Sequence, residues 1–384
     1  MEENKEKRGL ISWLEKRINL FELFSIISSF GLFYSELDSK KPLKEAVKEV
    51  LEKRVPPYAR WPQILGIITI ILFFFQVLTG ILLAFYYVPS LNESYNSVKF
   101  IIRDTHFGWF IHQIHYWGSN LLIIILIIRV IRFYYHGVYK SPRELLWIFG
   151  ITLLVLSMVQ AFFGNILIMD ENKCWSSIRG IEIIRNIPGL NWAYLFLMGS
   201  YDINQQTIIR AYFFHISLLP LLFLIFLYLN ISGIRKLGLS EIPWETKKRK
   251  EIPFYPHHFF NLLILLFIIF GILVTFSVLF PTPFYKPVDP SFTPPGILPG
   301  WFFLPIYGFF ELFFKIIPKY ILGLISVIIF FLILFLPFID RKEVRIFKER
   351  IVAIFIGAIF LIMIGLFTFF GVHKEISIPL RNIF

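Results

Sequence analysis

Seven apolar stretches, each about as long as a lipid bilayer is thick, constrain this chain more than any other feature of its sequence. They cover roughly residues 63–86, 114–135, 145–165, 212–234, 258–281, 320–338 and 351–371. A helix needs about 20 residues to cross a bilayer, and in lipid only helices and closed barrels satisfy their own backbone groups. Because 57% of all residues are hydrophobic, the sequence predicts an all-α transmembrane protein with about seven membrane helices.

Lysine and arginine gather in alternate loops of this predicted arrangement. They are frequent before residue 60, within 235–257 and within 341–350, and they are sparser in the other loops. Loops rich in basic residues stay in the cytoplasm. We therefore expect an integral protein of a bacterial or archaeal type of inner (cell) membrane, with a cytoplasmic N-terminus. The same pattern accounts for the net charge of +12, so no nucleic-acid partner is expected.

The stretches group into four predicted segments. They are a cytoplasmic, amphipathic segment at 1–60, a four-helix domain at 61–235, a basic linker at 236–257 and a three-helix domain at 258–384. In the last of these, the loop 282–318 is long and rich in proline. Ordered loops of that length are often functional, although a rigid surface cap would have the same composition.

Histidines and glycines recur at matching depths in the first four stretches. His115 opens the second stretch and His215 opens the fourth. The first and third stretches each carry two glycines fourteen residues apart, namely Gly66, Gly80, Gly150 and Gly164. Fourteen residues are nearly four helical turns, or about 21 Å, so each pair shares one face. Glycine leaves room for a flat macrocycle and histidine supplies axial ligands to haem iron, whereas helix packing alone would also use small residues.

The single cysteine, Cys174, narrows the kinds of cofactor site that this chain can build. It excludes an intrachain disulfide, a covalent CxxCH haem attachment and a cysteine-ligated metal cluster within the chain.

The chain resembles cytochrome b of the bc-type quinol–cytochrome c or plastocyanin oxidoreductases. The matching stretches include QVLTGILLAFYYVPS, FGWFIHQIHYWGSN, TIIRAYFFHISLLPLL and LPGWFFLPIYGFFELF, and the resemblance runs from about residue 11 to 371. It implies a four-helix haem bundle followed by a three-helix quinol-site half. It also implies haem b and quinol as ligands. Rieske-type iron–sulfur and cytochrome c-type subunits, or substitutes for them, would be partners in a dimer surrounded by membrane lipid.

The resemblance assigns site residues one by one. His115 and His215 match the axial ligands of the haem nearer the outer side, and Gly80 and Gly164 match the glycines that face it. Arg210 matches an arginine near this haem.

Further matches concern the surroundings of that haem and the quinol site. His112 stands where an arginine usually lies near the haem propionates. Pro299 and Trp301 lie in the loop that lines the outer quinol-oxidation site, and Asp170 lies on the surface helix that helps to close it.

The family's inner haem would lack both of its ligands in this chain. Arg129 and Asn230 stand where the second pair of histidines is expected, and arginine stays protonated and cannot ligate iron. We therefore expect a single bis-histidine haem. Aromatic side chains such as Phe73, or a lipid tail, would fill the inner space, and Arg129 can reach phosphates at the membrane edge.

The quinol-binding motifs also depart from the family. Gly300 replaces the glutamate of the Pro-Glu-Trp-Tyr motif, which removes a general base for quinol oxidation. Glu311 is a candidate replacement, because ionisable residues in apolar helices are often functional. An ion pair between Glu311 and Lys315, four residues on, is the alternative. At the start of the fifth stretch, Asn261 replaces an acidic residue of the inner quinone site.

Three functions remain open at this point. The first is a quinol-oxidising subunit with one outer haem that does not run a full quinone cycle by itself. The second is a redox-silent anchoring subunit, or a degenerate partner of an intact cytochrome b in a heterodimer. The third is a membrane carrier for lipid or quinone, which the paired histidines argue against because unpaired histidines in lipid are costly.

Overall fold

The computed structural model describes residues 13–14, 16–18, 54–55, 61–185, 187, 189–238, 240, 252–253, 255–256, 259–292, 294–342 and 344–373. Most of the described residues are helical, which confirms the all-α transmembrane class. Within them, six helices are long and apolar enough to cross a membrane.

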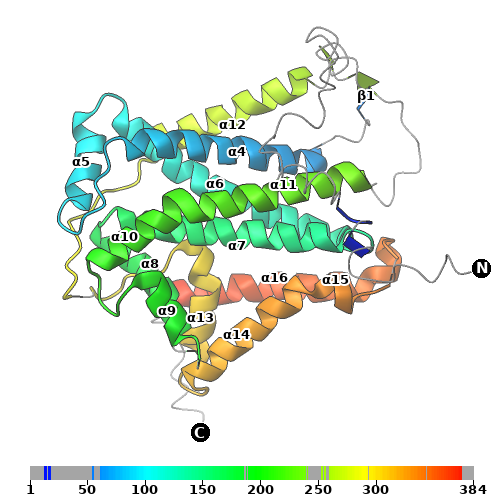
Figure 1. Cartoon of the computed structure of the whole chain (residues 1–384). Coiled ribbons are helices and arrows are strands. Elements are labelled where there is room, and N and C mark those ends of the chain that lie inside the picture. Colours follow the sequence, from blue (N-terminus) through cyan, green and yellow to red (C-terminus); the bar gives the residue numbers. More distant parts are fainter. Residues whose placement is uncertain are drawn as a thin grey trace, which may run out of the picture.

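Four of these helices form a bundle (Figure 1). They are α4 (Trp61–Ala84), α6 (Gly108–Tyr135), α7 (Glu144–Leu167) and a continuous fourth helix. The fourth helix consists of α10 (Gln205–Phe213), the π-helical turn η1 (Phe214–Leu218) and α11 (Leu219–Leu237). Buried leucines from three helices, Leu72, Leu126 and Leu153, meet at the centre of the bundle. Helix α12 (Phe259–Leu279) packs against α4 and α6.

The two ends of the bundle carry different elements (Figure 1). One end, called the α8 end below, carries the short helices α5 (Ser94–Asp104), α8 (Glu171–Arg185) and α9 (Asn191–Met198). The other, called the N-terminal end, lies near the described residues of the first segment. There Arg17 forms a buried ion pair of 2.7 Å with Glu144. The two-residue strands β1 (Arg54–Val55) and β2 (Ile252–Pro253) pair antiparallel. Most of the predicted amphipathic segment 1–60 lies outside the described residues.

The C-terminal half contains one helix that differs from the prediction. The stretch 320–338 was expected to form one span, but α14 (Lys319–Leu334) ends before α15 (Leu336–Ile339) begins. Pro337 causes the break, because proline has no N–H to donate and its ring clashes with the carbonyl four residues before it. That carbonyl, of Ile333, instead accepts a 2.8 Å hydrogen bond from Trp147 Nε1. The division leaves an apolar helix of 16 residues where the sequence predicted a seventh full span.

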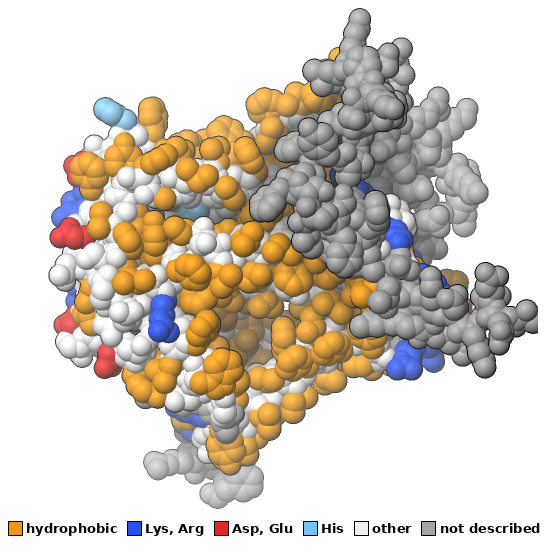
Figure 2. All heavy atoms as spheres, viewed as in Figure 1, with side chains coloured by type: hydrophobic (Ala, Val, Ile, Leu, Met, Phe, Trp, Pro, Cys, Tyr) orange, Lys and Arg blue, Asp and Glu red, His pale blue; other side chains and the backbone are white. Residues whose placement is uncertain are grey.

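Helix α16 (Ile351–Val372) supplies the last span and crosses the shorter α13 (Leu304–Phe313) closely. A Cβ on Gly308 would lie 1.7 Å from the carbonyl oxygen of Phe367, so only glycine fits at this crossing. The 3₁₀ turns η3 (Trp301–Phe303) and η4 (Phe347–Arg350) precede α13 and α16. On the face shown in Figure 2, apolar side chains cover most of the flank, and most of the charged side chains of the described residues lie towards the two ends. This distribution suits an integral membrane protein.

Candidate cofactor site

A cavity of about 470 Å³ lies inside the four-helix bundle, towards the α8 end. Its walls come from α4, α6, α7 and the fourth helix, and they include Gly80, His115, Gly164 and His215. Its volume lies within the roughly 300–1,000 Å³ that is typical of cofactor pockets. The four residues that spacing placed at one depth therefore border the same space.

The rings of His115 and His215 approach each other within this cavity. Their centroids are 6.0 Å apart and their planes are inclined at 71°. An imidazole nitrogen binds a metal ion at about 2 Å, and the ring centre lies roughly 1 Å behind that nitrogen, so two axial ligands have ring centres about 6 Å apart. The separation of the two rings thus fits coordination of one iron between them.

Thr79 fixes the tautomer of His115. The Thr79 hydroxyl donates to the carbonyl oxygen of Phe75 at 2.6 Å, and it lies 2.9 Å from His115 Nδ1. Because its only hydrogen is engaged with the carbonyl, the hydroxyl oxygen must accept a hydrogen bond from Nδ1–H. The neutral ring then has a free lone pair on Nε2, which is the form that binds a metal.

Gln160 fixes His215 in the same way from another helix. His215 Nδ1 lies 2.9 Å from the backbone oxygen of Gln160, which can only accept. His215 sits in the π-helical turn η1, where Leu219 N–H bonds to the carbonyl of Phe214 and leaves the His215 carbonyl without its usual partner. The side-chain Nε2 of Gln160 donates to that carbonyl at 2.5 Å. Gln160 therefore holds both the ring and the backbone of His215, at a π-bulge of the kind often found at functional sites.

The two glycines at this depth stand directly against the histidine rings. A Cβ on Gly164 would lie 2.8 Å from His215 Cε1, and a Cβ on Gly80 would lie 3.3 Å from His115 Cε1. Real Cβ atoms avoid the first distance, so a side chain at residue 164 would displace the ring. Gly164 is thus needed to keep the His215 ring where it is, whereas a Cβ at residue 80 would only crowd the His115 ring.

Polar atoms in the cavity wall lack partners among the described residues. Gln76 Nε2, His112 Nδ1 and Gln160 Oε1 are buried and make no hydrogen bond there, and all three residues line the cavity. Buried polar atoms normally have partners, so their orphan state fits a polar ligand in this space. Arg210 does not line the cavity. It donates to the carbonyls of Leu195 (2.8 Å) and Phe196 (2.6 Å) near the end of α9.

Gly66 and Gly150, which precede Gly80 and Gly164 by fourteen residues, lie towards the N-terminal end of the bundle, and their surroundings differ. Nothing lies within 4 Å of a Cβ placed on Gly66 or on Gly150, yet the nearby cavity lined by Gly66 measures only about 40 Å³. Arg129 Nη2 donates a short hydrogen bond directly to Asn230 Oδ1. The two side chains at the expected ligand positions therefore join α6 to α11 without a group between them.

Two stacked aromatic rings lie between the level of the His115 and His215 pair and the level of the Arg129 and Asn230 pair. Phe73 stacks on Phe223 with centroids 4.4 Å apart, and both rings line the large cavity. The sequence predicts that Phe73 helps to fill the space of the missing inner haem. In the structure, its ring also borders the large cavity that contains His115 and His215.

The carboxylate of Asp170 is fully engaged in structural contacts. The residue is completely buried. Oδ1 accepts from the backbone N–H groups of Asn172 (2.9 Å) and Lys173 (3.0 Å), which caps α8. Oδ2 accepts from the backbone N–H of Tyr285 at 2.6 Å, which anchors the loop 282–318. Asp170 thus positions the surface helix and the loop.

The remaining quinol-site candidates lie along that loop and on α13. Pro299 is buried, and Trp301 Nε1 donates to Asn120 Oδ1 on α6 at 2.7 Å. Glu311 is half-buried on α13. Burial raises the pKa of its carboxyl, and the nearby cations Lys319, Arg179 and Lys315 oppose that rise. None of these residues lines the large cavity.

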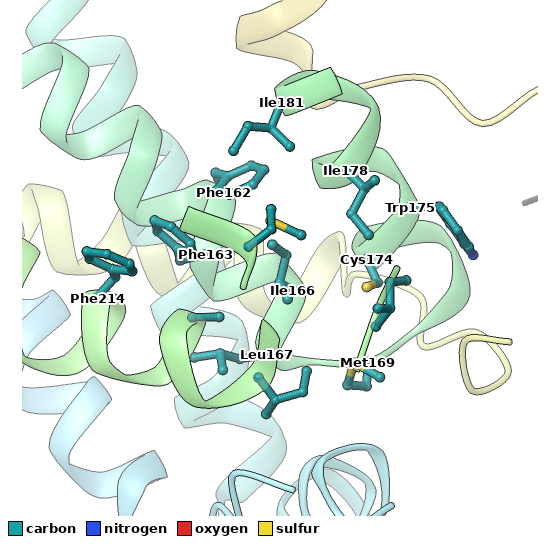
Figure 3. Close-up of a cluster of buried hydrophobic side chains, with 14 of the residues drawn as sticks. Phe162, Phe163, Ile166, Leu167, Met169, Cys174, Trp175, Ile178, Ile181 and Phe214 are labelled. Atoms are coloured by element: carbon teal, nitrogen blue, oxygen red, sulfur yellow. The ribbon is translucent and has the colours of Figure 1, made fainter. Parts of the chain in front are cut away.

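A buried apolar cluster supports the wall around His215 (Figure 3). It joins α7, α8, α9 and the fourth helix, and within it Phe163 stacks on Phe214 with centroids 5.0 Å apart. Phe214 begins the π-helical turn and precedes His215. Packing of this cluster therefore fixes the turn that carries the ring.

Cys174 provides a chemical test of that cluster. It is completely buried, and burial raises the pKa of its thiol to about 12. Because the thiolate is the reactive form, we expect a maleimide to label Cys174 at neutral pH only after unfolding. Mass spectrometry of the folded and the denatured chain measures this, and Ser291→Cys provides an exposed positive control. Fast labelling of folded Cys174 would contradict the packing of α8.

Comparison with known proteins agrees with this architecture. The family model described as Cytochrome b/b6/petB matches residues 50–238, and the model described as Cytochrome b(C-terminal)/b6/petD matches residues 287–380. Cytochrome b of Mycosarcoma maydis is 30% identical over 289 residues, which are 73% of this chain and 71% of the relative. Cytochrome b6 of Synechococcus sp. (strain RCC307) is 31% identical over 212 residues, covering 54% of this chain and 95% of the relative. A chain of a solved structure titled Hyperthermophilic respiratory Complex III has the same fold, with a TM-score of 0.74, 24% identity and coverage of 94% of this chain and 91% of that one.

Proposed function

Because the chain belongs to the cytochrome b/b6 family, we propose that it is a membrane subunit of a quinol-oxidising electron-transfer complex that holds one b-type haem between His115 and His215. The observation that carries this proposal is the pair of rings 6.0 Å apart, each with Nδ1 engaged by a neighbour. When bound there, haem would supply one-electron transfer.

The residues around the large cavity would each serve this haem. His115 and His215 would hold the iron through Nε2, and Gly80 and Gly164 would leave space for the macrocycle. Among the orphan polar atoms, Gln76 Nε2 could donate to its carboxylates, and so could His112 Nδ1 in the tautomer that carries its proton there. Arg210 would act indirectly, through the end of α9.

A second haem at the N-terminal end has no ligands in this proposal. Arg129 and Asn230 bond to each other, and arginine cannot replace histidine as an iron ligand. Electrons could then not cross the membrane through two haems of one chain, so this protomer would not run a full quinone cycle by itself. An intact cytochrome b in a heterodimer, or another acceptor, would have to take the electrons.

We extend the proposal to partners and orientation. Rieske-type and cytochrome c-type subunits, or substitutes, would meet the α8 end, where Pro299 and Trp301 border the quinol-facing loop. The basic N-terminal end would face the cytoplasm of a bacterial or archaeal type of cell membrane. The four-segment division at residues 60, 235 and 257 is part of the same proposal.

A redox-silent anchoring subunit is the second candidate, and two observations favour it. Gly300 offers no carboxylate to take a proton from quinol, and both oxygens of Asp170 are engaged by backbone N–H groups. Glu311 remains the candidate base, because burial raises the pKa of its carboxyl and so makes the carboxylate a stronger proton acceptor.

Haem content per polypeptide of the purified chain distinguishes the two candidates. A pyridine haemochrome assay with a redox titration should give one b-type haem with a single midpoint potential. No haem would favour the anchoring subunit. Two haems with separate potentials would contradict the proposed single-haem site.

Gln160→Ala should weaken the site without removing it. The variant leaves the carbonyl of His215 unsatisfied inside the bundle, which costs about 1–3 kcal/mol, while the backbone of residue 160 still accepts from Nδ1. We expect lower thermal stability and a shifted haem midpoint potential with haem retained. Thr152→Ala on the same helix is the matched control, since its hydroxyl bonds only to the carbonyl of Ile148. Equal midpoint potentials in the two variants would show that Gln160 does not position His215.

A further inference from the structure

Lys173, in the first turn of the surface helix α8, places a positive charge against the wall of the large cavity. Its Nζ lies 5.8 Å from the centre of the Tyr116 ring, which is within the range of a cation–π contact. Tyr116 lines the cavity and follows His115 on α6. The charge of Lys173 is also close enough to act on the ring of His112, which lines the cavity about one turn before Tyr116.

The start of the loop 282–318 holds this ammonium group in place. Lys173 Nζ donates to the carbonyl oxygen of Pro283 at 3.2 Å, and the neighbouring N–H of Thr282 donates to Gln113 Oε1 on α6 at 3.0 Å. Lys173 is therefore held where the loop meets α6. An ammonium has three N–H groups, so the bond to Pro283 uses only one of them.

The described wall of the cavity carries no lysine, arginine, aspartate or glutamate of its own. The two acidic residues just before Lys173 are already engaged. Asp170 accepts from three backbone N–H groups, and Glu171 pairs with Lys286 at 3.0 Å. Burial lowers the pKa of the Lys173 ammonium, and the charge of Asp170 opposes that fall. A further negative charge in the cavity would stabilise the ammonium in the same way.

We propose that the ammonium of Lys173 orients the haem that the proposed function places in this cavity, by attracting its carboxylates, and that the same charge raises the midpoint potential of that haem. The inference rests on the proposed function. A carboxylate near His112 and Tyr116 would interact with Lys173 through a low-dielectric surround, where charges act on each other more strongly than in water. Oxidised haem carries one more positive charge than reduced haem, so a nearby cation disfavours the oxidised state.

An optical redox titration of the full haem-loaded chain in detergent tests this inference. Lys173→Gln removes the charge. At a fixed ambient potential it should lower the ratio of reduced to oxidised haem about tenfold, which is a fall of about 59 mV in the midpoint potential of a one-electron couple. Lys173→Arg keeps the charge and should retain the wild-type potential. Lys286→Gln is the matched control, because it also removes one positive charge beside α8, but from a side chain that is 70% exposed and therefore screened by water and salt.

Two results would overturn the inference. One is an equal midpoint potential in Lys173→Gln and Lys286→Gln. The other is an equal fall in Lys173→Gln and Lys173→Arg, which would show that the charge is not what acts on the haem. Lys173→Met keeps the apolar stem against Tyr116 and repeats the measurement if Lys173→Gln does not fold. Loss of haem from both neutral variants would support the inference if Lys173→Arg keeps its haem, and would overturn it if Lys173→Arg loses haem too.

Haem counts in the same samples separate this inference from the proposed function. A wild-type chain without haem would overturn both. One haem whose potential does not depend on the charge at residue 173 would overturn the inference alone. Two haems would contradict the single-haem proposal, and the inference would then stand if Lys173→Gln shifts one of the two potentials and fall if it shifts neither.

Discussion

A His115→Ala variant of the full chain is expected to purify without b-type haem. The proposed iron site has one ligand from α6 and one from the π-helical turn. Among the described residues none takes the place of His115, since the cavity's third histidine, His112, lies nearly a turn earlier on α6. The change also leaves Thr79 without its Nδ1 donor. Haem per chain, measured by the pyridine haemochrome assay, should fall from about one to near zero because both axial ligands hold the haem.

The matched control for this variant is His106→Ala. His106 is exposed, precedes α6 and does not line the cavity, so haem content should stay at the wild-type value. Thermal unfolding of both variants shows whether the fold survives. A His115→Ala chain that keeps its full haem content would eliminate His115 as a ligand and with it the proposed site.

Much of the fold can be read from the sequence, because membrane helices are set by length and apolarity. The first four spans and the break at Pro337 both follow from local rules. A proline inside an apolar run ends a helix, whereas apolarity alone predicts one unbroken span over 320–338. The capping role of Asp170 was equally readable, since aspartate before a helix is a common N-cap. The family resemblance instead implies a place for it beside the quinol-oxidation site.

The arrangement around the histidines could be predicted only in part. Fourteen-residue spacing placed Gly80 and Gly164 at the depth of His115 and His215, and the structure brings these four residues to one cavity. The contacts of Thr79 and Gln160 depend on helix rotation and on the π-helical turn, which periodicity does not encode. Pro220, which follows that turn, is the one local signal for it, because proline leaves a carbonyl of the preceding turn unpaired.

Valine at Gly164 is expected to remove haem, whereas valine at Gly150 on the same helix is expected to leave it bound. The two glycines are fourteen residues apart on α7 and face two different depths. At residue 164 the new Cβ would lie 2.8 Å from His215 Cε1, while at residue 150 nothing lies within 4 Å. Overpacking at the first position costs about 1–3 kcal/mol or more, which corresponds to haem binding weakened roughly fivefold to more than a hundredfold.

This pair of variants tests the number of haems as well as their place. If a second haem lay at the depth of Gly150, Gly150→Val would lower the haem count as Gly164→Val does, and the redox titration would lose a different component in each variant. With one haem, only Gly164→Val changes the spectrum. Under the single-haem proposal Gly150 should tolerate a side chain, since the Arg129–Asn230 hydrogen bond joins α6 to α11 directly and no macrocycle would lie there for that side chain to strike. A loss of haem in Gly150→Val would therefore overturn the single-haem proposal, even with His115 and His215 intact.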